Sequence, residues 1–122
     1  MPDRFLKTLN TTVNSHDFSF GITLVIAGGV ITGTLISAKT FFDGFADSLS
    51  QAWPGGPNED IRSSFAEWGQ PEAASLHEDF IHLKDARYVS GRDVVPAMPE
   101  GLLWRGRIEA VSGFSLGTYS QP

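Results

Sequence analysis

The sequence predicts an α+β fold in which an N-terminal helix accompanies a small, strongly curved, five-stranded antiparallel sheet. Three observations support this prediction: apolar residues at helical spacing near the start, alternating apolar and polar residues in several short runs, and glycine-containing turns between those runs. A chain of 122 residues with 41% hydrophobic residues is long enough for one compact core. We therefore expect a single domain over residues 1–122, with a helical insertion at about residues 38–78.

The first expected elements are a helix and a hairpin. Between Asp3 and His16 one apolar face recurs at helical spacing, formed by Phe5, Leu6, Leu9 and Val13. Two strands are expected at Ser19–Ala27 and Val30–Ser37, joined by Gly28-Gly29, because a tight hairpin turn favours glycine. The segment from Phe18 to Ile36 carries no charge and is long enough to span a bilayer, but its period of two favours the hairpin over membrane insertion.

Two helices are expected next. Ser37 is a candidate N-cap for the first, whose wide apolar stripe comprises Phe41, Phe42, Phe45, Ala46, Leu49 and Trp53. Pro54 to Pro57 must end this helix, and a third helix begins at Asn58 or Asp60 and ends at Gly69. The stripe is most simply part of the core. An interaction role stays open, since adjacent phenylalanines cannot both face one direction.

The C-terminal part predicts three further strands. The first, Phe80–Val89, needs a β-bulge near Asp85 to keep its apolar residues in register. The other two form a closing hairpin around Ser112-Gly113, with strands at Leu102–Val111 and Phe114–Tyr119. The intervening segments, Pro71–Asp79 and Gly91–Gly101, are expected to be loops.

Two mid-strand glycines, Gly33 and Gly106, are natural points of strong coiling. Five short curved strands after an N-terminal helix resemble an Sm-like or SH3-like half-open barrel. A flat sheet with helices on one face is the alternative.

The sequence contains few motifs that indicate catalysis or the binding of a metal or cofactor. His77 and His82 lie five residues apart, whereas a zincin helix needs two histidines four apart, so we interpret both as surface or satisfied histidines. The chain has no cysteine, and no phosphate-binding loop, nucleophile elbow or dinucleotide fingerprint is present. We therefore expect no catalytic residue, metal site or cofactor, and no enzyme activity.

The candidate interaction surface comprises Trp104, Arg105, Arg107 and Phe42, because Trp and Arg are enriched at binding hot spots. Strand alternation places both arginines opposite Trp104, so either Trp104 is core or the arginines point inward. The sequence supports a structural role and an interface role for Trp104, Arg105 and Arg107 equally. An Sm-like nucleic-acid-binding module is the alternative function, although a net charge of -5 repels phosphate backbones.

Four stretches carry a more specific pattern: GITLVIAGGVITGTLIS at Gly21–Ser37, AKTFFDGFA at Ala38–Ala46, FIHLKDAR at Phe80–Arg87 and WRGRIEAVSGFSLG at Trp104–Gly117. In these stretches and their order the chain resembles the family of accessory gas vesicle protein U (GvpU). The segment from Gln51 to His77 lies outside the resemblance and is interpreted as a variable insertion.

The resemblance implies a cytoplasmic, non-enzymatic accessory protein associated with gas vesicles, the protein-walled buoyancy organelles. It implies no cofactor and no catalytic residues. From the strand edges expected of a short sheet we add the hypothesis that the chain forms homo-oligomers and contacts the vesicle shell or other vesicle proteins, without nucleic acid.

Overall fold

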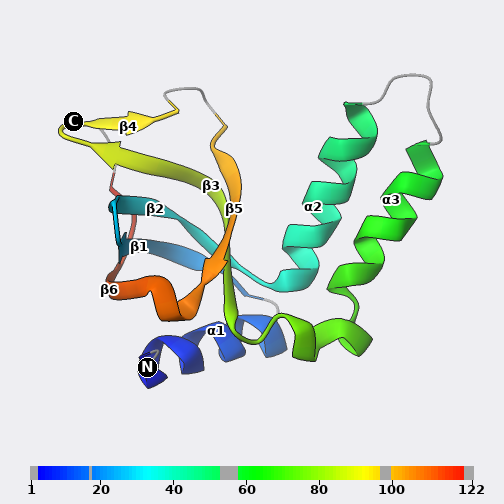
Figure 1. Ribbon diagram of the computed structural model, residues 1–122, viewed down its shortest axis with the longest axis horizontal. Coiled ribbons are helices and arrows are strands. Elements are labelled where there is room, and N and C mark those ends of the chain that lie inside the picture. The colour runs from blue at the N-terminus through cyan, green and yellow to red at the C-terminus, as the bar shows by residue number, and fades with distance from the viewer. Residues whose placement is uncertain (1–2, 17, 53–57, 97–99, 120–122) are drawn as a thin grey trace.

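The computed structural model describes residues 3–16, 18–52, 58–96 and 100–119. The N-terminal half comprises α1 (Arg4–His16), β1 (Phe20–Ile26), β2 (Gly29–Ile36), α2 (Ala38–Gln51) and α3 (Asn58–Ala66), followed by two short 3-10 helices, η1 (Glu67–Gly69) and η2 (Pro71–Leu76). The C-terminal half comprises β3 (Phe80–Ser90), β4 (Asp93–Val95), β5 (Leu102–Arg107), the 3-10 helix η3 (Ile108–Ala110) and β6 (Val111–Leu116). Figure 1 shows the sheet beside a projecting pair of helices, with α1 across one end of the sheet.

The six strands form one open antiparallel sheet. Its order is β4-β3-β2-β1-β6, and β5 also pairs with β3. β2 occupies one edge of β3, while β4 pairs with Tyr88–Ser90 and β5 with Phe80–Ala86 along the other. β3 therefore pairs with three other strands, β2, β4 and β5.

Four predictions about the strands and loops need correction. The sheet has six strands rather than five, because the expected loop Gly91–Gly101 contains the three-residue strand β4, too short for alternation to reveal. The expected loop Pro71–Asp79 contains η2. The strands predicted as a closing hairpin do not pair with each other: η3 interrupts Leu102–Val111, so β5 joins β3 and β6 joins β1. The first hairpin turns at Ala27-Gly28, since Ile26 pairs with Gly29.

The α+β class, the N-terminal helix, the first hairpin and the helical segment between β2 and β3 are confirmed. The strand pairings leave the sheet open, so the resemblance to an Sm-like or SH3-like barrel stays a prediction. No helix in the described ranges is long and apolar enough to cross a membrane.

The core lies on the face of the sheet that α1 covers. Leu6 and Val13 of α1 are fully buried against strand residues that include Ile22, Leu24, Ile31, Leu35, Ile81 and Leu83. Each such side chain contributes about 1.5–3 kcal/mol on burial. This packing makes α1 part of the same core as the sheet.

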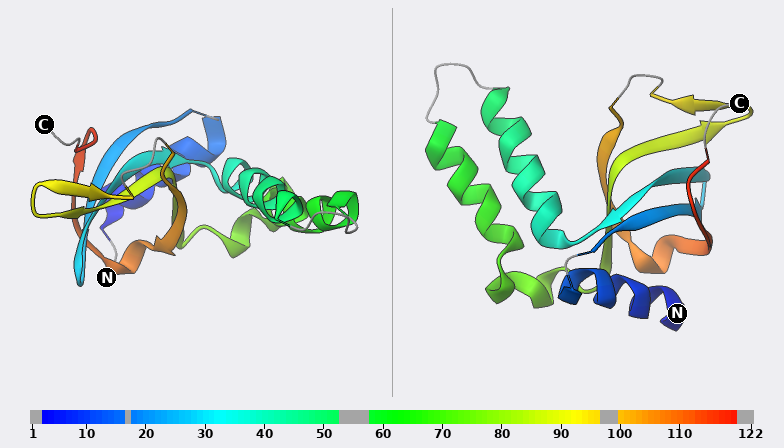
Figure 2. Two further views of the ribbon diagram at one scale, coloured as in Figure 1. Left: turned by 90° about the horizontal axis from the view of Figure 1, so that it is seen from above. Right: turned by 180° about the vertical axis from the view of Figure 1, so that it is seen from behind.

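Helices α2 and α3 form an arm that projects beyond the sheet, as two views show (Figures 1 and 2). Ser37 caps α2 as predicted, since its Oγ accepts a hydrogen bond from the Thr40 backbone N–H at 3.1 Å. At its foot the arm contacts the sheet through rings such as Phe41 and His82, whose centroids are 4.8 Å apart. The predicted stripe residue Trp53 and the helix-ending segment Pro54–Pro57 lie outside the described residues.

The predicted β-bulge near Asp85 is confirmed. Asp85 has φ of 54°, and the registers of β3 with β2 and with β5 both shift there. Its carboxylate accepts a hydrogen bond from the Gly101 backbone N–H at 2.7 Å. A Cβ at Gly101 would lie 2.4 Å from the Asp85 carbonyl carbon, so the approach requires glycine.

We predict that Gly101→Ala destabilises the fold by about 2 kcal/mol, because the added methyl group clashes with backbone that cannot rotate away. Gly113→Ala is the matched control, since a Cβ there meets nothing within 4 Å. Urea denaturation measures both free energies of unfolding. If both variants lowered the free energy of unfolding equally, the close packing of Gly101 against the bulge at Asp85 would be contradicted.

Candidate interaction site

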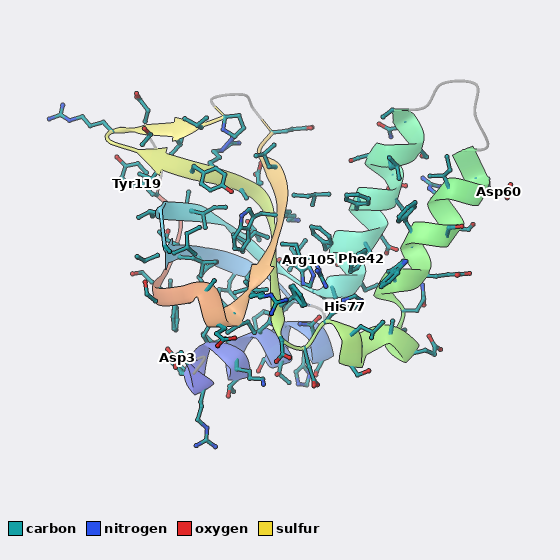
Figure 3. The ribbon with its side chains drawn as sticks, in the orientation of Figure 1. Asp3, Phe42, Asp60, His77, Arg105 and Tyr119 are labelled. Atoms are coloured by element: carbon teal, nitrogen blue, oxygen red, sulfur yellow. The ribbon has the colours of Figure 1, made fainter. Side chains whose placement is uncertain are left out.

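The candidate site lies on the face of the sheet opposite the core, where β3 and β5 meet the foot of α2. Strand alternation sends Ile81 and Leu83 into the core, and His82 between them faces the arm. His82 pairs in register with Arg105 of β5, so the two side chains share that face. Figure 3 shows Arg105, Phe42 and His77 together at the foot of the arm.

Arg105 joins two histidines. Its Nε donates to His82 Nε2 at 3.1 Å, and its Nη2 donates to His77 Nδ1 at 3.1 Å. A guanidinium has only donors, so both ring nitrogens must be unprotonated acceptors. His77 then carries its proton on Nε2, which donates to the Trp68 carbonyl oxygen at 2.6 Å. The network therefore ties β5, β3, η1 and the segment before β3 together, with both rings neutral.

The guanidinium of Arg105 also lies against two aromatic rings. Its Cζ lies 3.6 Å from the centroid of the Phe80 ring and 5.8 Å from that of Phe42. Such stacking adds about 0.5–2 kcal/mol, depending on desolvation. Burial lowers the pKa of Arg105, which remains a cation at neutral pH.

A groove opens beside this network. Its lining comprises Phe41, Phe42, Phe45, Phe65, Trp68 and Arg105, and its volume is about 460 Å³. We call it the aromatic groove. Phe41 is buried at its floor, whereas Phe45 is 40% exposed and Trp68 is 50% exposed. Two pairs of rings lie across it: the centroids of Phe45 and Phe65 are 5.9 Å apart, and those of Phe42 and Trp68 are 6.4 Å apart. The groove is thus an apolar surface with a single cation in its lining.

The structure separates the four predicted interaction residues. Phe42 and Arg105 come together in the aromatic groove. Arg107 lies beyond it, with Cζ 5.7 Å from the Phe80 ring centroid. Trp104 lies on the opposite face, against the core, and its Nε1 donates to the Tyr88 hydroxyl at 3.1 Å. An interaction role for any of the four stays a prediction.

Sequence reasoning missed the contributions of Phe65, Trp68, His77 and His82 to this site. The two histidines failed a test for metal spacing, whereas their actual partner is an arginine on a strand far along the chain. Only the register of β3 with β5 places His82 beside Arg105, and the sequence carries no local signal for that register. Within the described residues no group of three or more His, Cys, Asp or Glu side chains is arranged to hold a metal ion.

A family model described as gas vesicle protein GvpU-like matches residues 3–119. The match includes residues 51–77, which the sequence resemblance left unassigned. Comparisons with curated proteins and with solved structures found no match.

His82 should make stability depend on pH. Burial, together with the charge of Arg105, lowers the pKa of His82 from 6.5 to about 3. Between these values the unfolded chain binds a proton that the folded chain excludes, so stability falls as pH decreases below 6.5. We predict a loss of about 1.4 kcal/mol per pH unit, or about 2 kcal/mol at pH 5, in urea denaturation.

His82→Gln should flatten this dependence, since glutamine does not titrate. His16→Gln, at an exposed histidine on α1, should leave it unchanged. A wild-type stability that is constant from pH 7 to pH 5 would show that His82 titrates normally in the folded protein.

Proposed function

Because the chain belongs to the GvpU-like family of gas vesicle proteins, we propose that it is a non-enzymatic accessory protein that associates with gas vesicles in the cytoplasm. It acts through contact with the vesicle shell or other vesicle proteins, and through self-association. Its contribution is to the assembly or organisation of the organelle.

The aromatic groove is the observation that supports a contact surface. Exposed aromatic clusters mark interaction sites more often than isolated apolar residues do, and Trp and Arg dominate binding hot spots. Here Phe45, Phe65 and Trp68 are each at least 38% exposed beside Arg105. The rings form one continuous surface over the foot of the arm, as a binding site requires.

The sheet edges support self-association. β6 is an end strand of the sheet, and its residue Leu116 is 71% exposed. β5 pairs with β3 and with no other described strand, so its second edge is also unpaired. Unpaired edges are templates for another chain, and two different edges favour head-to-tail contacts between copies.

Nucleic-acid binding has less support. The net charge is -5, and among the described residues Arg105 is the single cation that lines the aromatic groove, whereas a phosphate backbone is contacted by several cations at once. No observation on the described surface favours a phosphate backbone as its partner.

We predict that the purified protein rises with intact gas vesicles in a flotation assay. Replacing both Phe65 and Trp68 with Ala should weaken this association at least about tenfold, because central aromatic side chains are hot spots. Phe5→Ala is the control, since Phe5 is 65% exposed at the far end of α1. Wild-type protein that stays below the vesicle layer would contradict the proposed contact.

We also predict that the average mass in analytical ultracentrifugation increases with protein concentration. Leu116→Lys should reduce that increase, because a lysine on an edge strand opposes strand pairing between copies. A constant monomer mass up to high concentration would exclude self-association through the edges.

A further inference from the structure

The chemistry of Arg105 indicates what the aromatic groove binds. Its guanidinium has five N–H donors, and only two have partners among the described residues. Both partners are neutral imidazoles, and no described carboxylate lies within 4.0 Å. Four other cations, Lys7, Lys39, Arg62 and Arg87, each pair with an aspartate, whereas the remaining ones share with Arg105 the lack of such a pair among the described residues. Of these unpaired cations, Arg105 is the one that lines the aromatic groove. Arg105 therefore keeps an uncompensated positive charge at an apolar surface.

This cation is held in place before any ligand arrives. Two hydrogen bonds and the Phe80 ring fix its plane, so little side-chain entropy remains to be lost on binding. A planar guanidinium in a fixed orientation suits a carboxylate, which accepts two parallel hydrogen bonds. The charge of the groove thus complements an acidic group.

The shape of the groove distinguishes between kinds of acidic ligand. Small-molecule sites enclose most of the ligand surface, whereas here Phe45, Phe65 and Trp68 remain 38% to 50% exposed. An open strip of rings along two helices matches the way an amphipathic segment lays bulky side chains into a surface groove.

We propose that the aromatic groove binds an amphipathic segment of another gas vesicle protein, in which an Asp or Glu lies beside bulky apolar side chains. The carboxylate pairs with Arg105, and the apolar side chains cover Phe42, Phe65 and Trp68. This inference rests on the proposed function, since it names the chemistry of the vesicle partner.

The first test uses a pair of synthetic helical peptides of about 16 residues with blocked ends, long enough to form helix. Both carry leucines at positions i and i+4, and position i+3 is Glu in one peptide and Gln in the other. Affinity is measured by isothermal titration calorimetry or by the NMR shift of the Trp68 indole N–H. We expect the Glu peptide to bind at least about fivefold more tightly than the Gln peptide, as a charge-assisted pair requires.

Variants assign this preference to Arg105. In Arg105→Gln the preference for the Glu peptide over the Gln peptide should disappear. In Arg105→Lys it should survive in part, because lysine keeps the positive charge but cannot donate two parallel hydrogen bonds to a carboxylate. Arg107→Gln is the matched control from the same strand and should keep the full preference. If Arg105→Gln does not fold, the lysine variant and Trp68→Ala carry the test, and Trp68→Ala should weaken both peptides equally.

Three results would overturn the proposal: equal binding of the two peptides, binding of neither, or a preference that survives Arg105→Gln. Tight, Arg105-dependent binding of laurate without peptide binding would instead assign the groove to a small amphiphile. Dimerisation lost in Trp68→Ala would assign it to a second copy of the chain.

The second test separates this inference from the proposed function. Intact vesicles are treated with a carbodiimide and ethanolamine, which converts accessible carboxylates to neutral amides, and flotation is repeated. We expect wild-type protein to float with untreated vesicles and at least about fivefold less with treated ones. Equal flotation with both would overturn the acidic partner and leave vesicle association intact, whereas no flotation with either would contradict both.

Discussion

The guanidinium of Arg105 and its two imidazole acceptors determine how the arm meets the sheet. Arginine is paired here with neutral rings rather than with carboxylates, so the interaction requires that His82 Nε2 and His77 Nδ1 carry no proton and act as acceptors. The network connects four parts of the chain, from η1 to β5, through hydrogen bonds of 2.6 to 3.1 Å. Removing the cation would leave acceptors at a partly buried junction, a loss that costs about 1–3 kcal/mol for each unsatisfied group.

The same short stretch of β3 serves both faces of the sheet. Ile81 and Leu83 belong to the core, while His82 between them is the anchor of the outer network. His82 Nδ1 is buried without a hydrogen-bond partner among the described residues, and the centroid of the His82 ring lies 4.8 Å from that of Phe41. This position therefore combines one buried, unsatisfied ring nitrogen with the hydrogen bond that links β3 to Arg105 of β5.

Local patterns predicted most elements, because helix caps, turn glycines and alternation depend on neighbouring residues. Ser37, the bulge at Asp85 and the ends of α1 follow from such signals. The strand pairing of β5 and β6 did not follow, since η3 breaks an alternating run of residues that resembles one long strand. The site required pairing information as well. Phe42 and Arg105 were identified individually, but their proximity to His77 and Trp68 arises from contacts between residues far apart in the chain.

Attachment at one end gives the arm the geometry of a lever. α2 has 14 residues and is therefore about 21 Å long, so a rotation of about 10° at its foot displaces its far end by about 4 Å. Five of the six side chains that line the aromatic groove come from the arm and η1, and only Arg105 comes from the sheet. A rotation of the arm as one body would therefore carry the rings together and change mainly their distance from the cation.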